Sequence, residues 1–216
     1  MLDMPPVAPL AFVRRPHQHR YQAWAPKLCR CIVLTSWPAM QYWVMLESQP
    51  NVRKYCERPA TAIIDGKERV IDFWTQLDDQ EQWIVISNED DSLLPVELEQ
   101  PSTRSIERTH IQFVSPQSIE PRAVWIENWL TILPYMASAA RLVDAPLVAQ
   151  VIDVCQTATS LYHIEKHLAR HDRTLVRTAV FMALHRGELL GLDLEHRPWD
   201  LDSQFVKSGA GRQRAT

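Results

Sequence analysis

Glycine is scarce in this chain, and long hydrophobic runs are absent. Only 5 of the 216 residues are glycine, and they form no glycine-rich loop of the kind that cradles nucleotide phosphates, which argues against nucleotide hydrolysis. No apolar stretch reaches roughly 18 residues and no charged-then-apolar leader is present, so the sequence predicts neither secretion nor membrane spanning. We therefore expect a cytoplasmic protein without a membrane partner.

Cysteine and net positive charge are also limited. The 4 cysteines are Cys29, Cys31, Cys56 and Cys155. They have neither the paired spacing of a zinc site nor the pattern of a secreted disulfide framework, which fits a reducing compartment. The formal net charge is -3, so the chain has no global basic field for nucleic acid, and any such binding needs local patches of lysine and arginine.

The strongest local signal that is present is Asp65-Gly66, which separates two runs rich in β-branched and aromatic residues. An Asp-Gly pair in this setting predicts a β-hairpin between Ala60–Ile64 and Val70–Gln76, and Trp83–Ser87 is expected to add a third strand. Asp72 then places a carboxylate within a mostly apolar strand, where it loses solvation and needs a cation, a donor or a proton. Asp72 is thus the first candidate site residue, the alternative being a half-exposed aspartate paired with an arginine.

Residues 1–25 combine four prolines with several basic residues and show no sustained periodicity. This composition predicts a flexible basic arm with little structure of its own. Arg14, Arg15 and Arg20 contribute much of its positive charge. Two interpretations stay open, a solvated tail or an arm that contacts the phosphates of DNA.

Residues 26–143 are expected to form an α/β domain with a small mixed sheet flanked by helices. Ser36 fits the N-cap of a helix with apolar residues at helical spacing, and this helix should end before Pro50. The further elements expected are strands over Lys27–Leu34, Val52–Cys56 and His110–Val114, a weakly helical stretch over Val96–Arg108, and a helix over Arg122–Met136.

Residues 144–206 are expected to form a second, α+β domain. Its predicted helices cover Leu147–Cys155, Ser160–Leu168 and Leu175–His185. Gly187 closes the last helix, and two short extended runs follow, Glu188–Leu194 and Arg197–Leu201. Three helices followed by a hairpin are typical of a winged helix, whose third helix commonly enters the major groove of DNA. Residues 207–216 are expected to be an unstructured tail.

Basic residues surround the third of these helices. They are Lys166, Arg170, Arg173, Arg177 and Arg186. One interpretation is a surface that binds DNA through its phosphates. The other is a protein-docking module, because winged helices also serve that purpose and this third helix is mostly apolar.

Several short motifs follow one another in a specific order along the chain. In the first domain they are Pro26-Lys27-Leu28, the stretch from Ser36 to Glu47, Gln49-Pro50-Asn51-Val52, Tyr55, Glu57, Pro59, Asp65-Gly66-Lys67 and Ile71-Asp72-Phe73. In the second they are His185-Arg186-Gly187-Glu188-Leu189 and Asp193-Leu194-Glu195-His196-Arg197-Pro198-Trp199-Asp200-Leu201-Asp202. Together they resemble the TnsA endonuclease family of heteromeric transposases, over nearly the whole chain after the arm.

This resemblance implies a restriction-endonuclease-like PD-(D/E)XK fold for the first domain and a winged helix for the second. It also implies an activity, since members of the family cut the 5′ ends of a transposon with Mg²⁺ or Mn²⁺ while an integrase-like transposase cuts and joins the 3′ ends. Acidic oxygens hold these hard cations, which polarise the scissile phosphate and lower the pKa of the attacking water. The implied partners are transposon-end DNA, that transposase and an AAA+ transposition regulator.

Only part of the family's catalytic pattern is present. The pattern asks for a Glu on the first helix, an Asp on the second hairpin strand, and a Glu or Gln followed two residues later by a Lys on the third strand. Asp72 matches the strand Asp, but the other positions fall on Ala39, Val85 and Ser87. Because Mg²⁺ gains affinity from several charged ligands, a lone Asp binds it weakly. The resemblance therefore implies a nuclease fold that has lost its chemistry.

Three hypotheses follow. The leading one is a catalytically degenerate, TnsA-like subunit that binds DNA and docks to the transposase assembly. One alternative is an active Mg²⁺-dependent endonuclease with a rearranged site, built from Asp72 and a displaced Glu47. Another is a winged-helix DNA-binding regulator whose first domain is only a dimerisation scaffold.

Overall fold

The computed structural model describes residues 8–12, 19–64, 66–77, 80–87, 92–99 and 106–209, except for the side chains of 92–99 and 106–110. By their contacts these residues divide into two compact units. The first unit takes in the described residues up to Leu46 together with Asn51–Pro121, and the second takes in Glu47–Pro50 and the described residues from Arg122 onward. We expected the boundary between the two domains after residue 143. It lies instead between Pro121 and Arg122, because the helix over Ala123–Ala139 packs within the second unit.

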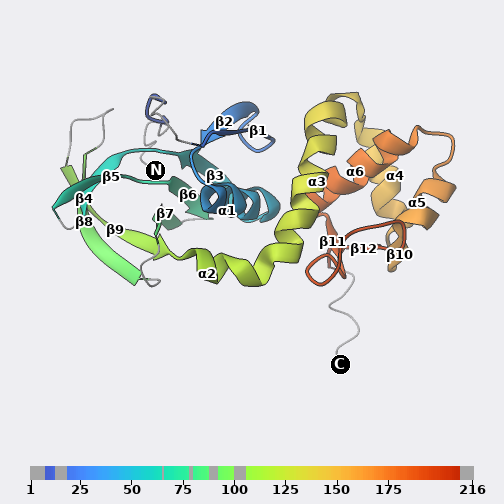
Figure 1. Ribbon diagram of the computed structural model, residues 1–216. Coiled ribbons are helices and arrows are strands. Elements are labelled where there is room, and N and C mark those ends of the chain that lie inside the picture. Colours follow the sequence, from blue (N-terminus) through green and yellow to red (C-terminus); the bar gives the residue numbers. More distant parts are fainter. Residues whose placement is uncertain are drawn as a thin grey trace. The chain divides into compact units, whose positions relative to one another are not determined.

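A mixed sheet is the centre of the first unit. Its strands are β3 (Val52–Glu57), β4 (Thr61–Ile64), β5 (Lys67–Val70), β6 (Phe73–Leu77), β7 (Gln80–Ile86), β8 (Ser92–Glu99) and β9 (Ile106–Val114). They lie in the order β3-β6-β7-β9-β8-β4-β5, with β7 parallel to β9 and the other described pairs antiparallel. Figure 1 shows helix α1 (Trp37–Ser48) beside β3, β6 and β7. The prediction of an α/β fold with a mixed sheet is confirmed.

The predicted hairpin is present but shorter than expected. Strands β4 and β5 pair antiparallel through a turn at Gly66, whose φ of +71° favours glycine. The strand expected over Val70–Gln76 is interrupted at Ile71-Asp72, so this part of the prediction is wrong. After the interruption the chain continues as β6, which pairs with β3 and β7 rather than with β4. Strand β7 beside β6 confirms the predicted third strand.

Residues 92–114 form a long hairpin of two strands. Strands β8 and β9 pair antiparallel along the whole length of β8. The expectation of a weakly helical stretch over Val96–Arg108 is therefore wrong, whereas the strand expected over His110–Val114 is confirmed as the last part of β9. The backbone of this region finds its hydrogen-bond partners across the hairpin, and local propensity does not reveal such pairing. A short helix, α2 (Pro116–Ile119), follows β9.

A two-stranded ribbon precedes α1. It pairs β1 (Tyr21–Ala25) with β2 (Arg30–Leu34) in antiparallel fashion. Strand β1 corrects the expectation that the basic arm has no structure up to residue 25. Helix α1 begins after Ser36, whose Oγ accepts the N–H of Ala39 as predicted for an N-cap, and it ends before Pro50.

The second unit is mainly helical. It contains α3 (Ala123–Ala139), α4 (Ala145–Val154), β10 (Thr159–Ser160), α5 (Leu161–His167), α6 (Arg173–His185), β11 (Leu189–Gly191) and β12 (Gln204–Lys207), with 3₁₀ turns η1 (Glu120–Arg122) and η2 (Ala140–Leu142) next to α3. Helices α4, α5 and α6 confirm the three predicted helices, and α3 confirms the one expected from residue 122. Gly187 follows α6 with a φ of +73°, and a Cβ there would lie 2.9 Å from the Cβ of Pro50, so only glycine fits.

A small sheet with the order β10-β12-β11 completes the second unit. The second extended run expected at Arg197–Leu201 is wrong, because the strand that pairs with β11 is β12 and residues 192–203 form the connecting loop. The loop is held by Asn128 of α3, whose amide donates to two loop carbonyls and accepts the N–H of Trp199. A side chain, rather than a neighbouring strand, satisfies these backbone groups.

Each unit has a hydrophobic core of its own. Trp43 and Phe73 are buried in the first, and Trp129 and Phe181 in the second. Within the part of the chain that the structure describes, no helix combines the length and the apolar character needed to cross a membrane. The large aromatic residues thus fill the interiors of two folded units.

Candidate functional site

Asp72 lies where the chain leaves one strand partner for another. The N–H of Ile71 donates to the carbonyl of Ala60 beside β4, whereas the N–H of Asp72 donates to the carbonyl of Ile84 in β7. The Asp72 carboxylate in turn accepts the N–H of Ile86, with 2.7 Å between Oδ2 and the nitrogen. The side chain supplies an acceptor to β7 at the point where the neighbouring strand is interrupted, which gives Asp72 a structural role.

The carboxyl of Asp72 is poorly compensated. Burial raises its pKa from 3.8 to about 6, and the hydrogen bond from Ile86 offsets only part of that effect. Among the described residues no Lys, Arg or His forms an ion pair with it. The alternative interpretation, an aspartate paired with an arginine, is therefore wrong for the described part of the chain.

The other three positions of the family pattern carry no acidic or basic group. Ala39 is buried in the first turns of α1, and Val85 of β7 is buried in the apolar cluster on one face of the sheet. Ser87 follows β7 directly. Val85 and Ser87 flank the residue whose N–H Asp72 accepts, so the structure brings these three positions together. A carboxylate at position 85 would be surrounded by hydrocarbon and would lose its hydration.

Glu47 has a partner within the second unit. Its side chain is fully buried, and its Oε2 lies 2.8 Å from Nε2 of His185 on α6. The adjacent Ser48 accepts a hydrogen bond from the indole N–H of Trp125. The structure thus joins Glu47 to His185, whereas Asp72 belongs to the first unit.

The side-chain atoms around Asp72 that could coordinate a metal ion do not fit a Mg²⁺ or Mn²⁺ site. One of its two oxygens accepts the N–H of Ile86, Ala39 and Val85 have no ligating atom, and Ser87 offers a neutral oxygen. Within the described ranges no group of three or more His, Cys, Asp and Glu side chains is arranged to hold a metal ion. Since Mg²⁺ needs several oxygen ligands, this donor set falls short of what the ion requires.

Arg58 is a neighbour of Asp72 that the sequence does not single out. The register that places Glu57 opposite Phe73 continues with Arg58 opposite Asp72, and the N–H of Arg58 donates to the Asp72 carbonyl at 2.9 Å. Its φ of +47° lies in the left-handed region, which residues other than glycine seldom adopt. The residue type of Arg58 does not reveal its positive φ. Its position between a predicted strand and Pro59 is the one feature of the sequence that could have drawn attention to it.

Two basic residues of the arm lie outside the described residues, namely Arg14 and Arg15. Arg20 is described and exposed. Its guanidinium lies over the ring of Phe12 and contacts the Gln22 amide oxygen. The residues of the tail from 210 onward also lie outside the described part of the chain.

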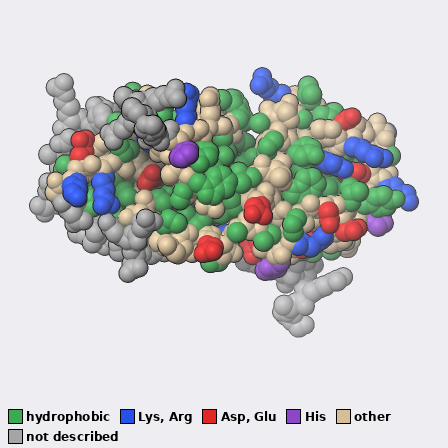
Figure 2. All heavy atoms as spheres, in the orientation of Figure 1, with side chains coloured by type: hydrophobic (Ala, Val, Ile, Leu, Met, Phe, Trp, Pro, Cys, Tyr) green, Lys and Arg blue, Asp and Glu red, His purple; other side chains and the backbone are tan. Residues whose placement is uncertain are grey.

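The basic residues of the second unit fall into paired and exposed ones. Arg177 on α6 forms an ion pair with the buried carboxylate of Glu165, so its charge is used within the unit. Lys166, Arg173 and Arg186 are exposed. On the face drawn in Figure 2, Lys and Arg side chains are interspersed with hydrophobic and acidic ones and form no continuous basic surface.

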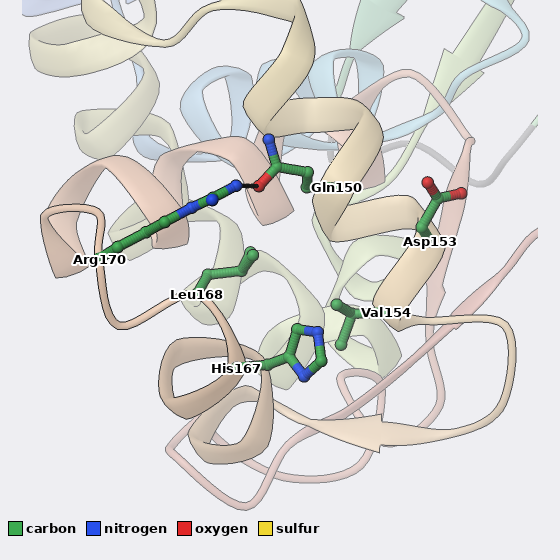
Figure 3. Close-up of a pocket in the computed structure, with 6 residues that line it drawn as sticks. All are labelled: Gln150, Asp153, Val154, His167, Leu168 and Arg170. Atoms are coloured by element: carbon green, nitrogen blue, oxygen red, sulfur yellow. Dashed lines mark hydrogen bonds between the residues drawn. The ribbon is translucent and has the colours of Figure 1, made fainter.

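Arg170 borders a pocket of about 540 Å³ between α4 and the residues that follow α5. Its guanidinium reaches across to α4 and donates to Oε1 of Gln150 at 2.7 Å, as the dashed line in Figure 3 marks. The same pocket is lined by His167 and by the acidic Asp153. Because it mixes acidic and basic side chains, this pocket does not favour a polyanion over other ligands.

Helix α6, the expected DNA-recognition helix, is largely covered. Of its residues only Arg173 and Thr174, in the first turn, are exposed. Helices α3, α4 and α5 and strand β11 all pack against it. A recognition helix reaches base edges in the major groove mainly through its N-terminal residues, and the first turn is the part of α6 that is exposed.

Comparison of the sequence with known proteins gives no match. No protein-family model matches the chain, and no curated protein matches it.

Proposed function

We propose that this protein is a TnsA-like subunit of a heteromeric DNA transposition machinery that has lost its nuclease chemistry. It binds transposon-end DNA and docks to the integrase-like transposase and its AAA+ regulator. The observation that carries the proposal is the environment of Asp72. One acidic position of the family pattern is retained there, in a strand framework where Val85 and Ser87 occupy the positions of the missing ligand and lysine.

The order of elements in the first unit supports a restriction-endonuclease-like fold. Helix α1 holds Ala39 at the position of the family's Glu. Strands β3, β6 and β7 then lie side by side and antiparallel, with Asp72 just before β6 and Val85 on β7. Strand β9 adds a parallel neighbour to β7, and the β4-β5 hairpin is inserted between β3 and β6. Ala39 and Val85 lie on a helix and a strand of the kind that the resemblance implies, whereas Asp72 lies between β5 and β6 and Ser87 lies just after β7.

The second unit supports a winged helix that acts mainly in docking. The order α4, β10, α5, α6, β11, β12 agrees with three helices followed by a hairpin. Helix α6 packs on α3, and the loop between β11 and β12 is tied to α3 through Asn128. Both elements that a winged helix commonly offers to DNA are therefore engaged. Contacts to DNA phosphates fall to the exposed Lys166, Arg173 and Arg186.

The absence of nuclease chemistry has a defined consequence for transposition. A subunit of this kind leaves the 5′ strands uncut, and the transposase alone cuts and joins the 3′ ends. The donor DNA then stays attached, which gives copy-type (cointegrate) products. The subunit contributes by holding the transposon ends and the transposase.

The first test is calorimetric titration of Mn²⁺ into the wild type and the Asp72→Ala variant, with and without a short DNA duplex. A single under-partnered carboxylate should give no binding that depends on Asp72. Mn²⁺ binding that Asp72→Ala abolishes would contradict the proposal and support an active nuclease with a rearranged site. Strand-resolved analysis of transposition products adds a second readout, in which 5′-strand cuts that require this subunit would also overturn the proposal.

A further inference from the structure

The backbone of Arg58 is held in a conformation that disfavours an arginine. The left-handed region, which Arg58 occupies with a φ of +47°, costs roughly 1–2 kcal/mol for residues with a Cβ. Its N–H donates to the carbonyl of Asp72, and its carbonyl accepts the N–H of Leu10. The strain is therefore maintained by hydrogen bonds on both sides. Retained strain of this kind is found more often at functional sites than elsewhere.

The side chain of Arg58 is also unusual, because no carboxylate among the described residues forms an ion pair with it. The buried Nε makes no hydrogen bond to any described residue. Burial lowers the pKa of Arg58 below its ordinary value; nearby Glu57 opposes this effect, and repulsion from Arg30 adds to it. An arginine keeps its proton even so, and a partly buried guanidinium with a free N–H requires an acceptor.

The carboxylates of Glu57 and Asp72 form hydrogen bonds with groups other than Arg58. Both oxygens of Glu57 accept hydrogen bonds from Arg30, each at 2.6 Å. The carboxylate of Asp72 accepts the N–H of Ile86. Among the described residues neither carboxylate forms an ion pair with Arg58, although the charge of Glu57 acts to raise the pKa of Arg58.

A second guanidinium shares an aromatic ring with Arg58. The Cζ atom of Arg58 lies 5.3 Å from the centroid of the Phe12 ring, and that of Arg20 lies 5.6 Å from the same centroid. Cation–π attraction holds both side chains in place, but the ring carries no net charge. The hydrogen bond of Arg20 to the neutral amide of Gln22 does not compensate its charge either. Two guanidinium groups thus contact one ring, and neither forms an ion pair with a carboxylate of the described residues.

We propose that Arg58 and Arg20, held by Phe12, form a binding site for a phosphate group. The planar guanidinium presents paired N–H donors that match two phosphate oxygens, and the two arginines together match a group with three or four oxygens. The site itself is argued from these contacts alone. The source of the phosphate rests on the proposed function, under which it belongs to the backbone of transposon-end DNA. Free phosphate is the other source.

Binding of a fluorescein-labelled DNA duplex to the full chain, followed by anisotropy over a series of salt concentrations, tests the site. Arg58→Asn is the main variant, because asparagine tolerates the left-handed region and keeps the backbone. Arg20→Gln is the second, and Arg53→Gln is the matched control, an exposed arginine on β3 that loses the same charge. We expect each site variant to bind roughly tenfold more weakly and to lower the salt slope by about 1. The control should stay at the wild-type slope.

A titration with inorganic phosphate, observed through the ¹⁵N signals of the arginine Nε atoms, separates the two sources. Shifts at Arg58 and Arg20 that appear although the duplex does not bind would uphold the site and reject the DNA-binding part of the proposed function. If the duplex binds the wild type and both site variants equally and phosphate leaves these signals unmoved, the site is wrong and the proposed function stands. Failure of both ligands to bind would also reject the site.

Discussion

The two units differ in how particular charged and amide side chains are partnered, although among the described residues each unit leaves two buried side-chain atoms without a hydrogen bond, on Arg58 and Thr75 in the first and on Trp129 and Asp193 in the second. Asn128 uses both amide donors and its acceptor, and Arg177 is paired with Glu165. By contrast, Asp72 has a single donor for a partly buried carboxyl, and Arg58 has none for its buried Nε among the described residues. Buried polar groups with hydrogen-bond partners stabilise a fold. Buried polar groups without partners lower its stability, so their presence needs an explanation other than stability. The charged groups of the first unit that lack such partners are those that the proposed phosphate site and the prediction for Asp72 concern.

The largest effect is expected at Asn128. Replacing it with alanine leaves two carbonyls and the N–H of Trp199 without partners, and each loss costs about 1–3 kcal/mol. We expect Asn128→Ala to lower the free energy of unfolding by about 4 kcal/mol, measured by urea unfolding of the second unit. The control is Thr131→Val at an exposed position, which removes a hydroxyl that accepts the indole N–H of Trp199 and donates to the carbonyl of Asn128 but leaves the Asn128 amide in place. Equal effects of the two variants would contradict the role given to Asn128.

A smaller loss is expected when Glu47 is removed. Breaking a buried pair by deleting one partner leaves the other buried and unpaired, which costs about 3 kcal/mol or more. We expect Glu47→Ala to destabilise the second unit by about that amount and to leave Mn²⁺ binding unchanged. Hydrogen exchange at the amides of α6 reports the loss near His185. A variant that keeps its stability but changes metal binding would restore the displaced-ligand hypothesis.

Asp72→Asn should stabilise the first unit. The folded pKa of about 6 lies above the ordinary 3.8, so between about pH 4 and about pH 6 the unfolded chain loses this proton while the folded protein keeps it. Wild-type stability therefore falls as the pH rises through this range. Asparagine cannot ionise and still accepts the N–H of Ile86, so the gain should be about 2 kcal/mol at pH 7 and should disappear below pH 4. Urea unfolding at several pH values checks this, and a gain independent of pH would refute the cause given.

The smallest effect on stability is expected at Arg58. Arg58→Gly relieves the left-handed strain but adds freedom to the unfolded chain, so the two effects offset each other to within about 1 kcal/mol. The matched change in the second unit, Arg177→Gln, leaves Glu165 buried without its cation and should cost about 2 kcal/mol. Thermal unfolding of both variants measures the difference. If the Arg58 variant were the more damaging, the contrast between the two units would be lost.

Local signals in the sequence predict much of the fold. The Asp65-Gly66 pair predicts the hairpin, and Ser36 predicts the start of α1, because turns and caps depend on neighbouring residues. The errors concern elements whose partners lie far along the chain. Strands β8 and β9 satisfy their backbone only in each other, and the loop that contains Arg197–Leu201 depends on Asn128, which no local pattern links to it.

The candidate site is predictable only in part. Asp72 stands out because a carboxylate in a mostly apolar stretch is unusual, and in the structure it accepts the N–H of Ile86, which lies between Val85 and Ser87. Arg58 depends on a backbone dihedral, and the pairing of Glu47 with His185 spans 138 positions. Neither has a signature in composition, spacing or periodicity.

The division of the chain also has a consequence for the order in which the protein is made. Glu47–Pro50 leave the ribosome long before α3, α6 and the turn at Gly187, to which they belong by their contacts. During synthesis Glu47 therefore remains without His185 until a further 138 residues have been added to the chain. A fragment that starts at Arg122 would lack this acceptor permanently, and we expect it to fold only when a peptide that contains residues 47–50 is supplied or fused to it.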